Sequence, residues 1–190
     1  MTGFEDDLKN SIVALRNGGV ILYPTDTIWG IGCDATNYKA VEKIYKIKKR
    51  LETKSLIILV DDKKRLERYV KEIPGITWDL MKNVEKPLTI IYPNARNLPK
   101  NVVAEDNSIA IRIVKNEFCI RLIREFGKPI VSSSANISGE ITPLVFRCVS
   151  ENVKRSVDYV VQLYQDVLQE VKPSRIIRLR ENGEFIIIRP

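Results

Sequence analysis

The sequence predicts a single α/β domain in which helices flank a twisted, mixed β-sheet. A chain of 190 residues has an ordinary length for one domain, and no linker or repeat divides it. Hydrophobic residues make up 44% of the chain, which is enough for a substantial core. Helical and strand-like apolar patterns alternate along the sequence, and the last two strands are spaced as a hairpin. We therefore expect both parallel and antiparallel pairs in the sheet.

Apolar residues at helical spacing, with capping residues at the ends, predict the helices. The predicted helical segments are 4–15, 40–51 and 116–126. Asn116 can cap the last of these, and Gly127 ends it. A further helix should begin at Thr142, because Pro143 at the first helical position lacks only an amide that would be unpaired there.

Short apolar runs between the helices predict the strands. The predicted strands are 20–23, 56–60, 87–92, 108–114, 129–132, 159–161, 175–179 and 185–188. Residues 24–34 are expected to form a polar loop, and 61–71 a charged segment. A turn at 181–183 should join the last two strands.

The composition excludes several kinds of site. The chain has no histidine, which excludes Ser-His-Asp catalysis, His-ligated metals and an imidazole base. Its three cysteines are far apart, which argues against a disulfide framework or structural zinc and fits a reducing cytoplasm. The acidic N-terminus is unlike a signal peptide, and no apolar run is long enough to span a membrane. The net charge of +7 is compatible with a phosphate-bearing partner.

The first polar motif, residues 23–32, follows a predicted buried strand with threonine and aspartate side chains. Loops at strand ends are where α/β proteins place ligands. The alternative is a turn in which Thr25 and Asp26 bind backbone amides. Gly30 and Gly32 also match a dinucleotide-binding fingerprint, but six residues separate them from the strand, which disfavours that interpretation.

The second motif is a basic cluster at the end of a predicted helix. Residues two apart on a helix point in nearly opposite directions, whereas extended residues two apart share a face. Lys48 and Arg50 can therefore meet one anion only if the helix ends near Lys48. The alternative is a solvated cationic helix end, which the helix dipole favours.

The third motif is a run of hydroxyl and amide side chains after the strand at 129–132. If this run is extended, Ser132, Ser134 and Asn136 share one side and can hold a phosphate, a ribose or a zwitterion. The alternative is a serine-rich turn. A serine nucleophile is disfavoured because the chain has neither histidine nor a Ser-x-x-Lys motif.

A fourth feature is Arg112, which lies in an otherwise apolar strand. A charge in such a position needs a partner or a ligand. The alternatives are an internal ion pair or an edge strand from which the arginine reaches water.

Taken together, these segments resemble the YrdC/TsaC family of threonylcarbamoyl-adenylate synthases. The loop 24–27, followed by an aromatic residue and Gly-x-Gly, is similar to the first family motif. Lys48-x-Arg50 resembles the Lys-x-Arg signature, and Pro87-Leu88-Thr89 the Pro-Leu-Thr strand. Residues 134–139 resemble the Ser-x-Asn signature. The four motifs keep the family order, and the resemblance covers nearly the whole chain in its short, single-domain form.

The resemblance implies one YrdC-like domain over residues 1–190 with a concave, basic face. It implies that L-threonine, bicarbonate and ATP are joined into threonylcarbamoyl-AMP and pyrophosphate, for the threonylcarbamoyladenosine modification of tRNA. ATP is then a substrate, Mg²⁺ accompanies its triphosphate, and the protein holds no metal of its own. The implied partners are tRNA and the machinery of the later transfer step, in the cytoplasm and away from membranes.

The resemblance also implies roles for individual residues. The residues expected to bind L-threonine are Thr27, Arg112, Ser132 and Ser174. Those expected to bind ATP are Lys48, Arg50, Lys54, Ser108, Ser134, Asn136, Thr142 and Arg189. Lys48 and Arg50 are the expected catalytic cations, and Asp26 is a weak candidate to contact Mg²⁺.

The sequence departs from the family pattern at several positions. Leu51 stands where a proline usually follows the Lys-x-Arg motif. Arg175 stands beside Ser174 where the family has threonine, and this cation would either add a phosphate contact or crowd the site. Two other functions compete with the synthase. One is a non-catalytic protein of the same fold that binds tRNA or double-stranded RNA. The other is the carbamoyl chemistry of hydrogenase-maturation carbamoyltransferases, which is disfavoured because their additional segments are absent.

Overall fold

The computed structural model describes residues 3–51, 56–82, 86–166, 173–180 and 182–190. Within these residues, nine strands form one mixed sheet in the order β7-β1-β2-β6-β3-β5-β4-β8-β9. The strands are β1 (Ile21–Tyr23), β2 (Gly30–Gly32), β3 (Ile57–Val60), β4 (Leu88–Tyr92), β5 (Ile109–Ile113), β6 (Ile130–Ser134), β7 (Tyr159–Val160), β8 (Arg175–Leu179) and β9 (Phe185–Arg189). The pairs β1–β7, β3–β5 and β4–β8 are parallel, and the others are antiparallel, so the predicted mixed sheet is confirmed.

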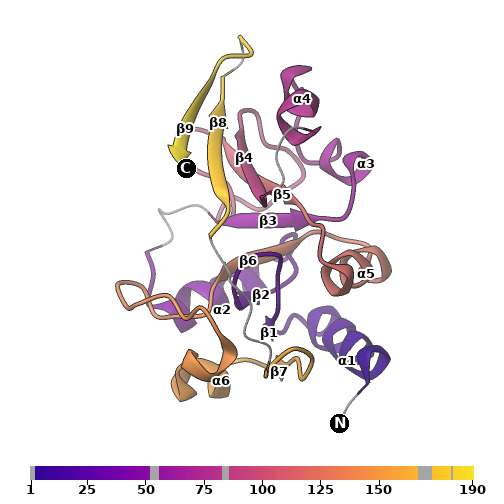
Figure 1. Ribbon diagram of the computed structural model, residues 1–190, viewed down its shortest axis with the longest axis vertical. Coiled ribbons are helices and arrows are strands. Elements are labelled where there is room, and N and C mark those ends of the chain that lie inside the picture. The colour runs from indigo at the N-terminus through magenta and orange to yellow at the C-terminus, as the bar shows by residue number, and fades with distance from the viewer. Residues whose placement is uncertain (1–2, 52–55, 83–85, 167–172, 181) are drawn as a thin grey trace.

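Helices flank this sheet. They are α1 (Phe4–Arg16), α2 (Tyr38–Lys48), α3 (Lys63–Leu66), α4 (Ile76–Lys82), α5 (Glu117–Phe126), a 3-10 turn at Phe146–Cys148, and α6 (Glu151–Ser156). Figure 1 shows α1 beside α5, and the Phe4 and Phe118 rings meet edge to face with centroids 5.7 Å apart. None of the helices in the described segments has the length and hydrophobicity to cross a membrane.

The capping residues act as the sequence predicts in α5. The Asn116 side chain accepts a hydrogen bond from the backbone N–H of Cys119 at 3.0 Å, and Gly127 ends the helix with a φ of 84°. A positive φ favours glycine because it has no Cβ. The α5 face carrying Phe118, Leu122 and other apolar residues is buried, so the predicted amphipathic helix is confirmed.

The predicted helix at Thr142 is wrong. Residues 141–145 have no regular structure, and α6 begins later, at Glu151, where the hydroxyl of the capping residue Ser150 accepts from the N–H of Val153. Val153 is buried, whereas Leu144 is half-exposed, so the helix forms where it can bury an apolar side chain. Pro143 alone does not start a helix.

The segment predicted as a polar loop, 24–34, contains strand β2. Gly30 and Gly32 allow this strand to form because the neighbouring strands β1 and β6 leave little room for side chains. A Cβ at Gly32 would collide with the Val131 carbonyl oxygen and lie 2.7 Å from the Tyr23 ring. The glycines serve close strand packing, and no strand-to-helix turn for a dinucleotide is present at this position.

The predicted second helix is shorter than expected, and this matters for the site. It ends at Lys48, because Lys49 takes the left-handed conformation with a φ of 49°. Leu51, the last apolar residue of the predicted stripe, lies beyond the helix and is exposed. The condition under which Lys48 and Arg50 can serve one anion is therefore met.

Candidate functional site

A cavity of about 340 Å³ opens over the middle of the sheet. Its walls come from the loop between β1 and β2, from Arg50 after α2, and from strands β3, β4, β5 and β6. The C-terminal strands β8 and β9 and the residues just before β8 complete the cavity. The sequence-predicted site residues that line it are Thr27, Arg50, Arg112, Ser132, Ser134, Thr142, Ser174 and Arg189. The fold therefore gathers residues that are more than 160 positions apart into one cavity.

Arg112 is the central cation of this cavity. Its side chain is almost fully buried, with the residue 4% exposed, and it donates three hydrogen bonds to hydroxyl groups. Nε donates to Thr89 at 3.0 Å, Nη1 to Thr27 at 3.1 Å and Nη2 to Ser174 at 3.1 Å. Among the described residues, no carboxylate lies within ion-pair distance of it.

Arg112 is a buried cation whose partners among the described residues are neutral hydroxyl groups. Burial lowers the pKa of Arg112, although the more distant charge of Asp26 opposes this effect. A guanidinium has five N–H donors, and three of them bond to described residues, so one N–H on each Nη has no partner among those residues. That pair matches the two oxygens of a carboxylate.

The C-terminal hairpin contributes to the same hydrogen-bond network. The Arg189 Nε donates to the Ser174 carbonyl oxygen at 2.8 Å, and Nη2 lies 3.2 Å from the Ser174 hydroxyl. Thr89 and Ser174 share a hydrogen bond of 2.9 Å. Arg175, next along β8, does not line the cavity, because alternate residues of a strand face opposite sides. The expectation that Arg175 would add a contact or crowd the cavity is not met.

Lys48 lies behind the cavity wall and is 2% exposed. Its ammonium group donates to the carbonyl oxygens of Ser134 at 2.5 Å and Asn136 at 2.7 Å, with two side-chain oxygens at 3.5 Å. The Lys48 carbonyl in turn accepts from the Ser138 N–H at 2.8 Å. Burial and the neighbouring Arg50 charge lower the pKa of Lys48 to about 8.

The serine-rich run continues β6 to Ser134 and then turns. Ser132, Ser133 and Ser134 all line the cavity, whereas Asn136 lies behind it. The Asn136 amide donates to the carbonyl oxygens of Ile137 and Glu140 at 3.0 and 2.9 Å, so it shapes the turn. The structure therefore brings Ser132 and Ser134 to the cavity as expected, but not Asn136, which takes part in the turn.

The first motif divides in the same way. The Thr25 hydroxyl donates to the Ile28 carbonyl at 2.7 Å and accepts from the Thr27 N–H at 3.1 Å, as a turn requires. One Asp26 oxygen accepts from the N–H groups of Lys115 and Asn116 at the start of α5. Of Thr25, Asp26 and Thr27, only Thr27 lines the cavity, so Asp26 supports the fold at this point.

A further residue expected to bind ATP, Ser108, does not reach the cavity. It is buried, and its hydroxyl donates to the Asp106 carboxylate at 2.6 Å. Lys54 lies outside the described residues. Sequence reasoning assigned no role to Thr89 and Ser133. Thr89 could have been found by the same signal as Arg112, since it is the polar residue of an apolar strand.

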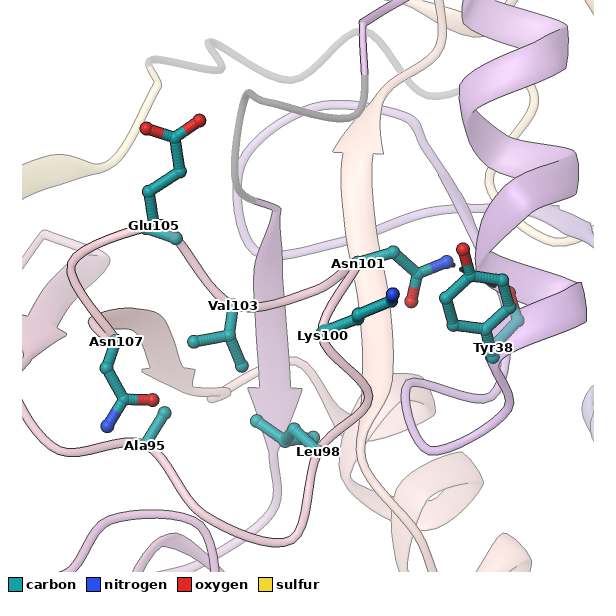
Figure 2. A pocket seen from close by; sticks show the side chains of 9 residues that line it. Tyr38, Ala95, Leu98, Lys100, Asn101, Val103, Glu105 and Asn107 are labelled. Carbon is teal, nitrogen blue, oxygen red and sulfur yellow. Dashed lines mark hydrogen bonds between the residues drawn. The ribbon is translucent and has the colours of Figure 1, made fainter.

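A second, wider hollow of about 550 Å³ lies between the start of α2 and the connection from β4 to β5. Figure 2 shows that Tyr38 faces this connection, whose side chains include Lys100 and Asn101. The Asn101 amide donates to the Tyr38 carbonyl at 3.0 Å. None of the sequence-predicted site residues lines this hollow, so it is separate from the candidate site.

The sequence and the fold of this chain are similar to those of known proteins. The Sua5/YciO/YrdC family model, described as "Telomere recombination", matches residues 13–190. The threonylcarbamoyl-AMP synthase of Pseudoalteromonas translucida is 37% identical over 160 residues, which are 83% of this chain and 86% of that protein. The putative threonylcarbamoyl-AMP synthase of Methanocaldococcus jannaschii is 37% identical over 183 residues, which are 96% of this chain and 83% of that protein.

A solved structure is similar throughout this chain. The P. abyssi Sua5 crystal structure complexed with L-threonine superposes with a TM-score of 0.86 at 26% identity. The match covers 100% of this chain and 55% of the Sua5 chain, so this chain spans little more than half the length of that relative.

Proposed function

The chain belongs to the Sua5/YciO/YrdC family, and from that premise we propose that it is an L-threonylcarbamoyladenylate synthase. It condenses L-threonine, bicarbonate and ATP to threonylcarbamoyl-AMP and pyrophosphate. The observation that carries the proposal is Arg112, a buried guanidinium with two N–H donors left for a ligand and no described carboxylate beside it. A small amino acid with a free carboxylate fits this arrangement.

In the proposed reaction, the amino group of threonine first reacts with bicarbonate to give a carbamate and water. A carbamate oxygen then attacks the α-phosphorus of ATP, and the bond to pyrophosphate breaks. The substrate itself supplies the nucleophile, so the protein needs no histidine and no covalent intermediate. Its task is to hold the two substrates in line and to stabilise the charge on the phosphates.

We assign the residues to the two substrates by their place in the cavity. Arg112, Thr27, Ser132 and Ser174 form the threonine end, and Arg189 holds Ser174 in place. Arg50, Ser133, Ser134 and Thr142 form the nucleotide end. Lys48 acts from behind, by fixing the turn at 134–136 and by placing its charge beside the phosphates.

Magnesium enters this proposal only with the triphosphate. The described residues contain no group of three or more Asp, Glu, Cys or His side chains that could hold a metal ion. The polar residues of the cavity wall carry hydroxyls or cations, which suit a phosphate rather than a divalent cation. Transfer to tRNA, the use of bicarbonate and a cytoplasmic location are further parts of the proposal.

The test is pyrophosphate release from the purified protein with ATP, magnesium, L-threonine and bicarbonate, omitting one component at a time. We expect release only when all are present. Arg112→Gln should raise the KM for threonine about 30-fold or more, because a charge-assisted carboxylate contact contributes about 2 kcal/mol. Arg16→Gln, which removes an exposed arginine from α1, is the matched control. Release without threonine, or an unchanged KM in Arg112→Gln, would contradict the proposal.

A further inference from the structure

A third hollow, of about 430 Å³, lies at the opposite end of β3 from the cavity. The cavity uses the first residues of β3, whereas α3 and α4 follow its last residue, Val60. Figure 1 shows α3 and α4 beside each other at this end of the molecule. The hollow lies between these helices and a turn near residue 96, and none of its lining residues belongs to the site already described.

Basic side chains outnumber acidic ones in the lining of this hollow. Lys63, Lys71 and Arg96 line it, with Glu67 as its acid. Lys63 and Glu67 are 3.9 Å apart and both more than half exposed, so this pair neutralises little. In the described segments, neither Lys71 nor Arg96 forms an ion pair with a carboxylate. The balance of charge in the hollow is therefore positive.

The backbone holds this hollow in a fixed shape. The segment after α3 is joined to the turn by two backbone hydrogen bonds. The Lys71 N–H donates to the Asn94 carbonyl oxygen at 3.0 Å, and the Arg96 N–H donates to the Tyr69 carbonyl oxygen at 2.9 Å. The Arg96 guanidinium also donates to the Glu67 carbonyl at 2.5 Å, which orients this cation. A held cation loses less conformational freedom when it binds an anion.

An aromatic side chain completes the hollow. Trp78, from α4, is half-buried, and the Lys63 ammonium lies 4.1 Å from the centre of its ring. Lys63 is 57% exposed and has a flexible side chain, so a planar group can displace it from the ring. The displaced ammonium can then pair with an anion beside that planar group.

We propose that this basic hollow binds single-stranded RNA, with a base stacked on Trp78 and the adjoining phosphates on Lys63, Lys71 and Arg96. Base stacking on an aromatic ring beside backbone-tracking cations is the usual way in which proteins hold single strands. Two further exposed cations, Lys64 and Arg68, follow the lining residues Lys63 and Glu67 in the sequence. An acidic protein segment would use the cations but leave the indole ring unstacked. The inference does not depend on the synthase activity, since binding is measured without substrates.

The experiment titrates the full-length protein with a fluorescently labelled single-stranded RNA of about 12 nucleotides, from about 50 to 200 mM salt. Tryptophan emission is followed in parallel. We expect binding that weakens with salt and quenches Trp78. Trp78→Phe should bind with similar affinity but lose the quenching, and Trp78→Ala should bind about 5- to 150-fold more weakly. Lys71→Ala with Arg96→Ala should reduce the slope of log K against log salt by about 0.7 for each cation removed.

The matched control removes the same charge elsewhere. Lys9→Ala with Arg16→Ala takes two exposed cations from α1 and should leave the RNA affinity within about twofold of that of the unaltered protein. Equal losses in this control and in the hollow variant would overturn the site and leave only net charge. Polyglutamate that binds as tightly, with no need for Trp78, would identify an acidic protein as the partner. Pyrophosphate release by the variants, measured separately, reports on the synthase alone.

Discussion

At the scale of single residues, the site depends on Arg112 being buried without an acid beside it. Three hydroxyl groups direct their oxygens at the guanidinium and reduce the cost of its burial. Hydroxyls do not neutralise the charge, so the guanidinium still attracts an anion. Sequence reasoning reached this residue because a charge in an apolar strand needs a partner. The hydroxyl partners come from three distant segments, which the local sequence pattern does not bring together.

Lys48 leads to a prediction about pH. Its pKa is lowered to about 8, so the lysine loses its charge as the pH rises through that value. A neutral lysine cannot stabilise phosphate charge. We therefore expect the affinity for a non-hydrolysable ATP analogue to fall between about pH 7 and 9, while Lys48→Arg shows no such fall because arginine remains charged. Calorimetric titration measures both, and identical pH profiles would contradict the role of Lys48.

The same shift has a consequence for folding. The ordinary pKa of the lysine is 10.5, so between about 8 and 10.5 the unfolded chain binds a proton that the folded chain has released. The contribution of this group to the free energy of unfolding therefore rises with pH in that window, opposite to the expected change in nucleotide affinity. Loss of affinity at high pH would then not reflect loss of the fold.

At the scale of elements, segments with strong local signals were predicted well. Helix α5, with a capping asparagine and a final glycine, has the predicted limits, and the C-terminal hairpin has the predicted pairing. Strand β2 was missed because three residues with two glycines carry no strand pattern; neighbouring strands impose its conformation. Helix α4 was missed because it is only seven residues long, and Thr77 is its one buried residue.

Strand β2 leads to a prediction about stability. Gly32→Ala would place a methyl group against the Val131 carbonyl and the Tyr23 ring, in a region where both neighbours are buried. Such overpacking costs about 1–3 kcal/mol, which lowers the Tm of a protein of this size by roughly 2–12 °C. Gly75→Ala is the matched control, because no atom lies within 4 Å of the added methyl group. Equal melting temperatures for the two variants would show that β2 can move aside.

At the scale of the whole molecule, the mixed sheet decides which distant residues meet. Strand β6 lies between β2 and β3, so its serines face the loop after β1 on one side and the β3–β5–β4–β8 part of the sheet on the other. The cavity is therefore built from both ends of the chain. Periodicity predicts all strands except β2 but not the order of the strands, and for this reason the site followed from motif resemblance rather than from pattern alone.

A cavity made in this way couples ligand binding to the stability of the entire fold. At 100 times its Kd, L-threonine should stabilise the protein by about 2.7 kcal/mol, which raises the Tm by roughly 5–11 °C. Arg112→Gln should show a shift close to zero under the same conditions. Differential scanning fluorimetry measures both proteins. Equal shifts in both would place threonine outside the Arg112 cavity.

Lys48 also links two of the sequence motifs through hydrogen bonds in both directions. Its ammonium holds the carbonyls of Ser134 and Asn136, and its own carbonyl holds the N–H of Ser138. We therefore expect a substitution of Lys48 to disturb the turn at 134–138 as well as the end of α2. A designed protein that received the lysine motif alone would therefore lack the carbonyl groups that hold the ammonium. One that received the serine turn alone would lack the ammonium that holds those carbonyls.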